Sequence, residues 1–293
     1  MDGIEVSCWE EFEQKLPELK PSGSSRNSPL LFRGQSDSSW PLNTSLERYG
    51  VQDYSFMKYF TVMHRVRPQI ETFTSYKWDM PTSEDLQKWT TTFGSPRDGF
   101  LAADYMMYLR HYGFPSPLLD WTESSKIAGY FAFRQPNEPA STKVSIYVFL
   151  ERPKGMKTTS SDRADIFNVG RLAARHHRHF LQQSSYTVCM NFSTDESEAK
   201  REWRFAKHEN VVNRERVRPH SPLITEFTKH ENMVNRKPEP EFRQDVLWKF
   251  NIPWSERRKV LKLLDEYNLN AHSLFGSEES LMETLAFREI DLP

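Results

Sequence analysis

The stretch HYGFPSPLLDWTESSKIAGYFA, residues 111–132, determines how this chain is expected to fold. Its first glycine and its two prolines predict a turn, after which the leucine pair enters the core as a strand. Asp120, Thr122 or Ser124 can cap a following helix, and small residues in that helix allow close packing. Considered as structure alone, the stretch is a strand-turn-helix junction whose aspartate and tryptophan are satisfied by their neighbours.

An arginine lies in a second stretch, LLFRG at residues 30–34, which predicts a short strand that ends at Arg33-Gly34. Arg33 near the end of that strand, followed by Gly34, leaves a guanidinium fork on a rigid support with no side chain beside it. Such a fork binds phosphate or carboxylate oxygens in pairs. The alternative is a structural salt bridge. Residues 40–48 add an aromatic ring, a proline turn and a second arginine, Arg48.

Helices and short strands are interspersed along the chain without a regular βαβ alternation, which favours an α+β fold. Helical spacing of apolar residues and β-branched or aromatic runs set these ranges. Helices are expected at 5–20, 53–66, 98–112 and 256–267, and further strands at 143–150 and 186–190.

Composition restricts the class of protein. The 293 residues carry a net charge of −1 and 13% aromatic residues, so a basic site has to be local and a packed core is expected. Cys8 and Cys189 form neither a disulfide framework nor a zinc site by themselves. Residues 1–5 lack the basic start of a secretory signal, and no stretch approaches the roughly 20 apolar residues that span a bilayer. A cytoplasmic protein without membrane attachment is expected.

These motifs resemble the FRG-domain family. Its Phe-Arg-Gly-Gln strand, its Trp-x-Leu-x-x-Ser-x-x-Arg stretch and its central His-Tyr-Gly to Leu-Leu-Asp-Trp-Thr segment match residues 32–35, 40–48 and 111–122. Looser likeness at 181–187 and 252–275 extends the resemblance to roughly residues 9–285. The sequence departs from the family pattern at Arg110, Ser116 and Pro117. It is expected to form a single domain, 1–293, with an insertion at 191–242.

FRG-type sequences are in turn similar to ADP-ribosyltransferases, though more distantly. That resemblance implies a small split β-sheet core with flanking helices, and NAD as a substrate with no metal. Arg33 would grip the NAD diphosphate, Thr122 and His111 would line the nicotinamide side, and Trp121 or Tyr112 would stack on a ring. The implied NAD-binding residues are Arg33, Gly34, His111, Tyr112, Asp120, Trp121 and Thr122.

The catalytic carboxylate of those enzymes has no direct counterpart here, because the matching strand offers Gln182 or Gln183. A carboxylate about 4 Å from the cationic transition state contributes roughly 4 kcal/mol at an effective dielectric near 20, or about three decades in rate. Glu202, in an alternating segment that suggests a strand, is the first substitute, with Asp120 and Glu123 as alternatives. Glu202 is equally well interpreted as a solvated charge. The expected catalytic set is Arg33, Gln182 and Glu202.

Two further features concern partners. The basic stretch 171–179 brings Arg171, Arg175 and Arg178 next to the expected site, where they would guide nucleic-acid phosphates; a solvated helix face is the alternative. The segment at 207–214 recurs at 229–236, as a local duplication or as a paired His/Glu ligand set.

The FRG resemblance therefore implies an ADP-ribosyltransferase-like toxin or effector from bacterial or phage conflict. It would modify RNA or protein and be restrained by an antitoxin partner. A non-catalytic nucleotide- or nucleic-acid-binding module is the alternative. A third possibility is an interaction scaffold with a purely structural Arg33–Asp120 pair.

Overall fold

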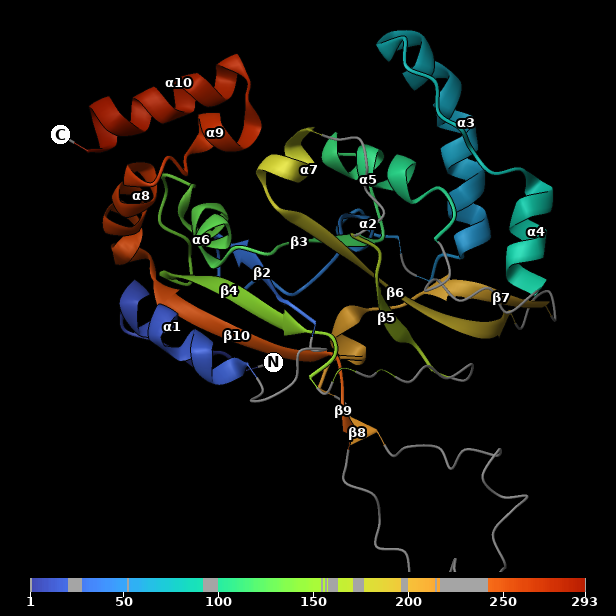
Figure 1. Ribbon diagram of the computed structural model, residues 1–293, viewed down its shortest axis with the longest axis horizontal. Coiled ribbons are helices and arrows are strands. Elements are labelled where there is room, and N and C mark those ends of the chain that lie inside the picture. The colour runs from blue at the N-terminus through green and yellow to red at the C-terminus, as the bar shows by residue number, and fades with distance from the viewer. Residues whose placement is uncertain are drawn as a thin grey trace, which may run out of the picture.

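An eight-stranded sheet, antiparallel except at one edge, organises the chain in a computed structural model (Figure 1). The structure describes residues 2–20, 28–51, 53–91, 100–153, 155, 157, 163–170, 177–195, 200–213, 215–216 and 242–292. Strand order is β1-β10-β4-β2-β3-β6-β5, with β7 paired to β6. The strands are β1 Ile4–Glu5, β2 Leu30–Gln35, β3 Leu118–Thr122, β4 Lys143–Leu150, β5 Asp165–Asn168, β6 Ser184–Asp195, β7 Lys200–Phe205 and β10 Val246–Pro253, with β8 Glu215–Arg216 and β9 Phe242–Arg243 in a separate pair.

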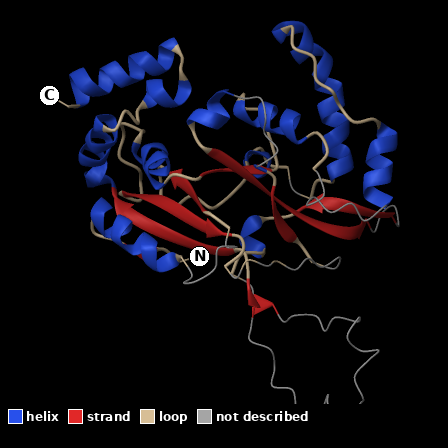
Figure 2. Cartoon of the chain, in the orientation of Figure 1, coloured by secondary structure: helices blue, strands red, loops and turns tan. Residues whose placement is uncertain are grey.

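Helices cover the sheet as two groups (Figures 1 and 2). One cluster packs α1, α6 and α8 against β2, β4 and β10, and a second packs α3, α4 and α5 against β3, β5 and β6. The helices are α1 Trp9–Lys15, α2 Ser45–Arg48, α3 Phe56–Thr74, α4 Ser83–Thr91, α5 Ala103–His111, α6 Ser125–Phe133, α7 His177–Leu181, α8 Arg257–Glu266, α9 Ala271–Phe275 and α10 Glu278–Ala286. Shorter turns are the 3₁₀ segments η1 Leu16–Leu19, η3 His208–Asn210 and η6 Trp254–Glu256, and the π-helical η7 Phe287–Asp291. No helix in the described ranges is both long and apolar enough to cross a membrane.

The sheet has one weak junction, between its two central strands. β2 pairs with β4 along its whole length and β3 does the same with β6, but β2 and β3 share a single residue pair, Phe32 with Thr122. The two strands therefore diverge on either side of that pair. Arg33 directly follows it, so its side chain lies where the two strands separate.

Gly34 has a packing role that the sequence did not indicate. A Cβ at this position would lie 2.0 Å from the Ala128 carbonyl oxygen and 2.6 Å from the Ala132 amide nitrogen. Only glycine lets α6 approach β2 this closely. We expected Gly34 to leave open space beside the guanidinium of Arg33. Instead, helix α6 packs directly against Gly34.

The mixed architecture expected from sequence, a sheet with flanking helices, is present. The strand expected at 143–150 coincides with β4, and the helix at 256–267 corresponds to α8. Other elements differ in length, since α3 continues to Thr74 and β6 to Asp195. Within the segment expected as an insertion, residues 191–195 and 200–205 belong to the main sheet, while 217–241 lie outside the described residues.

Candidate functional site

Two arginines converge on Asp120 at the weak junction of the sheet. The Arg33 guanidinium donates to the Asp120 carbonyl oxygen at 2.8 Å and lies 3.8 Å from its carboxylate, which also forms an ion pair with Arg110. The Arg33 side chain is only 13% exposed. Burial lowers the pKa of Arg33 to about 10, and the charges of Arg110 and Arg48 add to this effect while Asp120 opposes it.

A third arginine, Arg48, stands at the exposed edge of this group. Partial burial lowers its pKa, and the charge of Arg110 acts in the same direction. Its guanidinium donates to the Asn43 carbonyl oxygen at 2.7 Å. We call Arg33, Arg48, Arg110 and Asp120 the arginine cluster. Arg33 and Arg110 form ion pairs with Asp120, and the charges of Asp120 and Glu47 act on Arg48. Three positive charges therefore stand against two negative ones.

The arginine cluster leaves hydrogen-bonding capacity unused. The Nε atoms of Arg33 and Arg110 and the Oδ1 atom of Asp120 are buried, and none has a hydrogen-bond partner among the residues that the structure describes. Buried polar atoms in native proteins are nearly always paired. Three such atoms at one place mark a site rather than ordinary core packing.

A tyrosine between two histidines adjoins the cluster. The Tyr186 hydroxyl lies 2.5 Å from Nε2 of His111 and 3.4 Å from Nδ1 of His179, and Tyr186 sits opposite Asp120 in the pairing of β3 with β6. Burial raises the pKa of Tyr186, with the charge of Asp120 as the second cause. Burial also lowers the pKa of His179, which Asp104 and Glu123 counteract.

Comparison with known proteins gives one family match, within the first half of the chain. Residues 28–141 match the family model of the FRG domain. This chain contains an FRG domain. No curated protein matches the chain, and neither does any solved structure. The charged members of the arginine cluster all lie within the matched residues of the FRG domain, whereas Tyr186 and His179 come from the later strand β6 and helix α7.

The structure brings some of the expected ligand-binding residues together and buries others in the core. Arg33, His111 and Asp120 meet at the cluster, and Tyr112 follows His111 with its ring 61% exposed. Trp121 is 3% exposed, stacks on Phe149 with ring centroids 5.4 Å apart, and donates from Nε1 to Thr187 at 2.8 Å. The structure therefore does not support the ligand-stacking role expected of Trp121.

Thr122 is likewise occupied in the fold of the FRG domain. It is buried, and its hydroxyl accepts a hydrogen bond from the Ser124 amide at 3.1 Å. Ser124 in turn caps α6, accepting from the Ile127 amide at 3.3 Å. The hydroxyl expected to line a nicotinamide pocket instead shapes the turn between β3 and α6.

The expected catalytic side chains on the later strands do not reach the cluster. Gln182 and Gln183 precede β6 rather than lying in it, and Nε2 of Gln182 donates to the Leu274 carbonyl oxygen at 3.1 Å. Glu202 does lie in a strand, β7, but it pairs with Arg204 at 2.7 Å. Because Glu202 faces Ser193, about seven residues beyond Tyr186 along β6, it is roughly 23 Å from the cluster.

Glu123, one of the alternative carboxylates expected from the sequence, lies next to this region. It is exposed directly after β3, its amide donates to the Gln183 carbonyl oxygen at 3.0 Å, and its charge acts on His179. The sequence offered it only as an alternative. The signals for Arg48 and Arg110 were also visible in the sequence, in the 40–48 stretch and as a departure from the family pattern, but their convergence on Asp120 was not.

The partner-directed residues are described in part. Arg178 lies on α7 with its guanidinium 5.9 Å from the centre of the Tyr112 ring, whereas Arg171 and Arg175 lie outside the described residues. In the first copy of the repeated segment, His208 is buried with Nε2 3.0 Å from the Thr187 hydroxyl. Glu209 accepts from the Leu42 amide at 2.9 Å. The first copy is thus part of the folded core, and the second lies outside the described residues.

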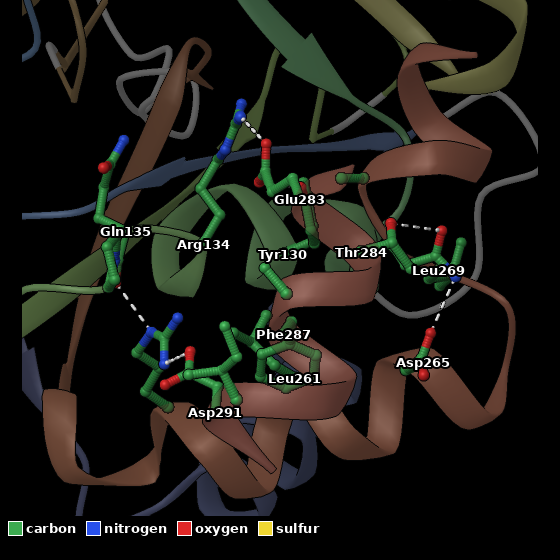
Figure 3. Close-up of a pocket in the computed structure, with 16 residues that line it drawn as sticks. Tyr130, Arg134, Gln135, Leu261, Asp265, Leu269, Glu283, Thr284, Phe287 and Asp291 are labelled. Carbon is green, nitrogen blue, oxygen red and sulfur yellow. Dashed lines mark hydrogen bonds and ion pairs between the residues drawn. The ribbon is translucent and has the colours of Figure 1, made fainter. Parts of the chain in front are cut away.

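A cavity of about 430 Å³ lies away from the cluster, between the end of α6 and helices α8 and α10 (Figure 3). Arg134 and Glu283 point toward one another at its rim, 2.8 Å apart, and the Tyr130 hydroxyl donates to Glu283 at 2.8 Å. Arg257 and Asp291 form a second pair at 2.7 Å. These charges are balanced in pairs, in contrast to the arginine cluster.

One group of possible metal ligands is present in the described part of the chain. Cys8, Glu10 and Glu256 place their ligand atoms within 4.8 Å of one another. The Lys259 ammonium already binds both carboxylates, at 2.7 Å and 3.0 Å. A metal ion there would compete with that ammonium, so this group is better understood as an ion-pair network.

Proposed function

We propose that this protein binds NAD at the arginine cluster and transfers its ADP-ribose to a nucleic acid or protein, as a toxin-like effector restrained by a partner. The pairing of both Arg33 and Arg110 with the single carboxylate of Asp120 carries this proposal, and the charge of Arg48 also acts on this group. A diphosphate brings two negative charges, and guanidinium forks bind phosphate oxygens through paired, charge-assisted hydrogen bonds. The effector setting rests on the family resemblance.

The residues around the cluster suit the parts of this reaction. Transfer breaks the bond between the ribose and nicotinamide, and the ribose carbon passes through a cation that a carboxylate stabilises. Glu123, an exposed acid directly after β3 whose charge acts on His179, takes that role in place of Glu202.

A non-catalytic nucleotide- or nucleic-acid-binding module is the second proposal, and one observation favours it. Gln182 and Glu202, the two residues expected to act at the ribose, are engaged elsewhere with Leu274 and Arg204. A site that holds a dinucleotide through arginines, with no carboxylate at its ribose, would bind without turnover.

Calorimetry with NAD, followed by transfer of label from NAD to cell RNA and protein, separates these proposals. Arg48→Ala and Arg110→Gln should each weaken NAD binding by roughly 10- to 100-fold, since a hydrogen bond to a charged group contributes about 1.5–3 kcal/mol. Arg288→Ala is the matched control, because Arg288 pairs with Asp265 on the C-terminal helices. NAD that is bound but stays intact would favour the binding module. Absence of NAD binding by the folded wild type would refute the transferase and the NAD-binding form of the module.

A further inference from the structure

Four aromatic rings form a continuous row next to the arginine cluster. Tyr76 and Trp78 follow α3, and Tyr108 and Tyr112 come from the end of α5. Ring centroids are 4.8 Å apart from Tyr76 to Trp78, 4.8 Å from Trp78 to Tyr108 and 4.6 Å from Tyr108 to Tyr112. We call these four residues the aromatic row. Tyr76 and Tyr112, at its two ends, are exposed.

An arginine extends the row across the next two helices. The Arg178 guanidinium, on α7, lies 5.9 Å from the centre of the Tyr112 ring and 5.7 Å from that of Phe275 on α9. Figure 1 shows α9, α7, α5 and α3 following one another along the upper side of the molecule. Phe180, on the same helix as Arg178, is 80% exposed. The row of rings is therefore followed by one guanidinium and a further ring on the same side of the protein.

The row ends at the proposed NAD site. Tyr112 directly follows His111, whose ring contacts the Tyr186 hydroxyl beside Asp120. A polymer lying along the row would reach the arginine cluster at its Tyr112 end. At the far end of the row, Arg67 and Lys77 both pair with the carboxylate of Glu71, at 3.7 Å and 3.3 Å.

We infer that the aromatic row and Arg178 bind a single-stranded nucleic acid and lead it to the arginine cluster. Bases stack on aromatic side chains regardless of sequence, and arginine adds cation–π and phosphate contacts. A duplex keeps its base faces covered, so only an unpaired strand can stack its bases on aromatic side chains. The inference rests on the proposed function where it names this strand as the acceptor of ADP-ribose; the binding surface itself does not depend on NAD.

Fluorescence anisotropy with labelled oligonucleotides of about 12 nucleotides, one RNA and one DNA, tests the surface. Tyr112→Ala should weaken binding roughly tenfold, the order expected for one lost base stack. Tyr267→Ala is a closely matched control, because Tyr267 is 62% exposed against 61% for Tyr112. It also carries a cation over its ring, Lys126 at 5.8 Å. Arg178→Ala is a second variant, should Tyr112→Ala fail to fold, and it should lower both affinity and salt dependence.

Three results would overturn the inference. They are equal losses in Tyr112→Ala and Tyr267→Ala, equal affinity for a duplex of the same sequence, and no oligonucleotide binding by the folded wild type. NAD calorimetry on the same preparation keeps the two proposals apart. Oligonucleotide binding without NAD binding would support the surface and refute the transferase. NAD binding without oligonucleotide binding would refute the surface and direct the search to a protein acceptor.

Discussion

Replacing Arg33 with alanine tests whether its guanidinium links the two halves of the sheet. The substitution removes the hydrogen bond to the Asp120 carbonyl oxygen and the ion pair with its carboxylate, at a place where β2 and β3 share one residue pair. A hydrogen bond from a charged donor contributes about 1.5–3 kcal/mol, and a buried carbonyl left without its donor costs about 1–3 kcal/mol. These contributions overlap, so we expect the free energy of unfolding to fall by about 3 kcal/mol.

That loss should be visible in a thermal melt. With an unfolding entropy of about 2 cal/mol/K per residue, a change of about 3 kcal/mol lowers the Tm of a chain this long by roughly 5 °C. Hydrogen exchange should at the same time speed up in β2 and β3. Arg48→Ala is the control, because its exposed guanidinium should contribute less than about 1 kcal/mol. If Arg33→Ala has the same Tm as the wild type and hydrogen exchange in β2 and β3 is no faster, the guanidinium does not stabilise the junction between these strands.

Three further outcomes are expected. Burial lowers the pKa of His208 to about 3. Below about pH 6.5 the His208 imidazole binds a proton in the unfolded chain but not in the folded chain. The free energy of unfolding therefore falls as the pH is lowered. Urea titrations should show that this group removes about 2–3 kcal/mol of stability between pH 7 and pH 4.5, and that His208→Gln lacks this part of the slope. Gly34→Ala should cost about 3 kcal/mol or more, or prevent folding, because its Cβ would lie 2.0 Å from the Ala128 carbonyl oxygen. If turnover of NAD is detected, Glu123→Gln should lower its rate by about 100-fold or more while Glu202→Gln leaves it unchanged; the reverse order would place the catalytic acid on β7.

The sequence predicted those elements whose own residues show a clear helical or strand pattern, without reference to distant partners. The 143–150 run is β-branched and aromatic because β4 is buried between β10 and β2. The sequence did not predict β10, because Lys249 and Asn251 interrupt its apolar pattern. In the structure these two side chains bind the Ser38 carbonyl oxygen and the Ser145 hydroxyl, which are far away in the chain. Partners at such separations cannot be inferred from periodicity.

The candidate site was predictable in its anchor and not in its surroundings. Arg33 and Asp120 were both identified from their motifs, and the structure places them in contact. Trp121 was misjudged because its burial depends on Thr187, an acceptor supplied by the neighbouring strand. The offset of Gln182 from β6 depends on where that strand begins, and strand ends are set by pairing rather than by residue type.

The strand order also constrains how the protein can be made. The two strands inside the FRG match, β2 and β3, are flanked in the sheet by β4 and β6, and β1 pairs only with β10, near the other end of the chain. At a synthesis rate of about 5–20 residues per second, β1 waits roughly 10–50 s for β10, its partner among the described strands, to leave the ribosome. During that interval the edges of the central strands are open to incorrect pairing. A chaperone that shields nascent chains should therefore raise the yield of this protein more than that of a helical protein of equal length.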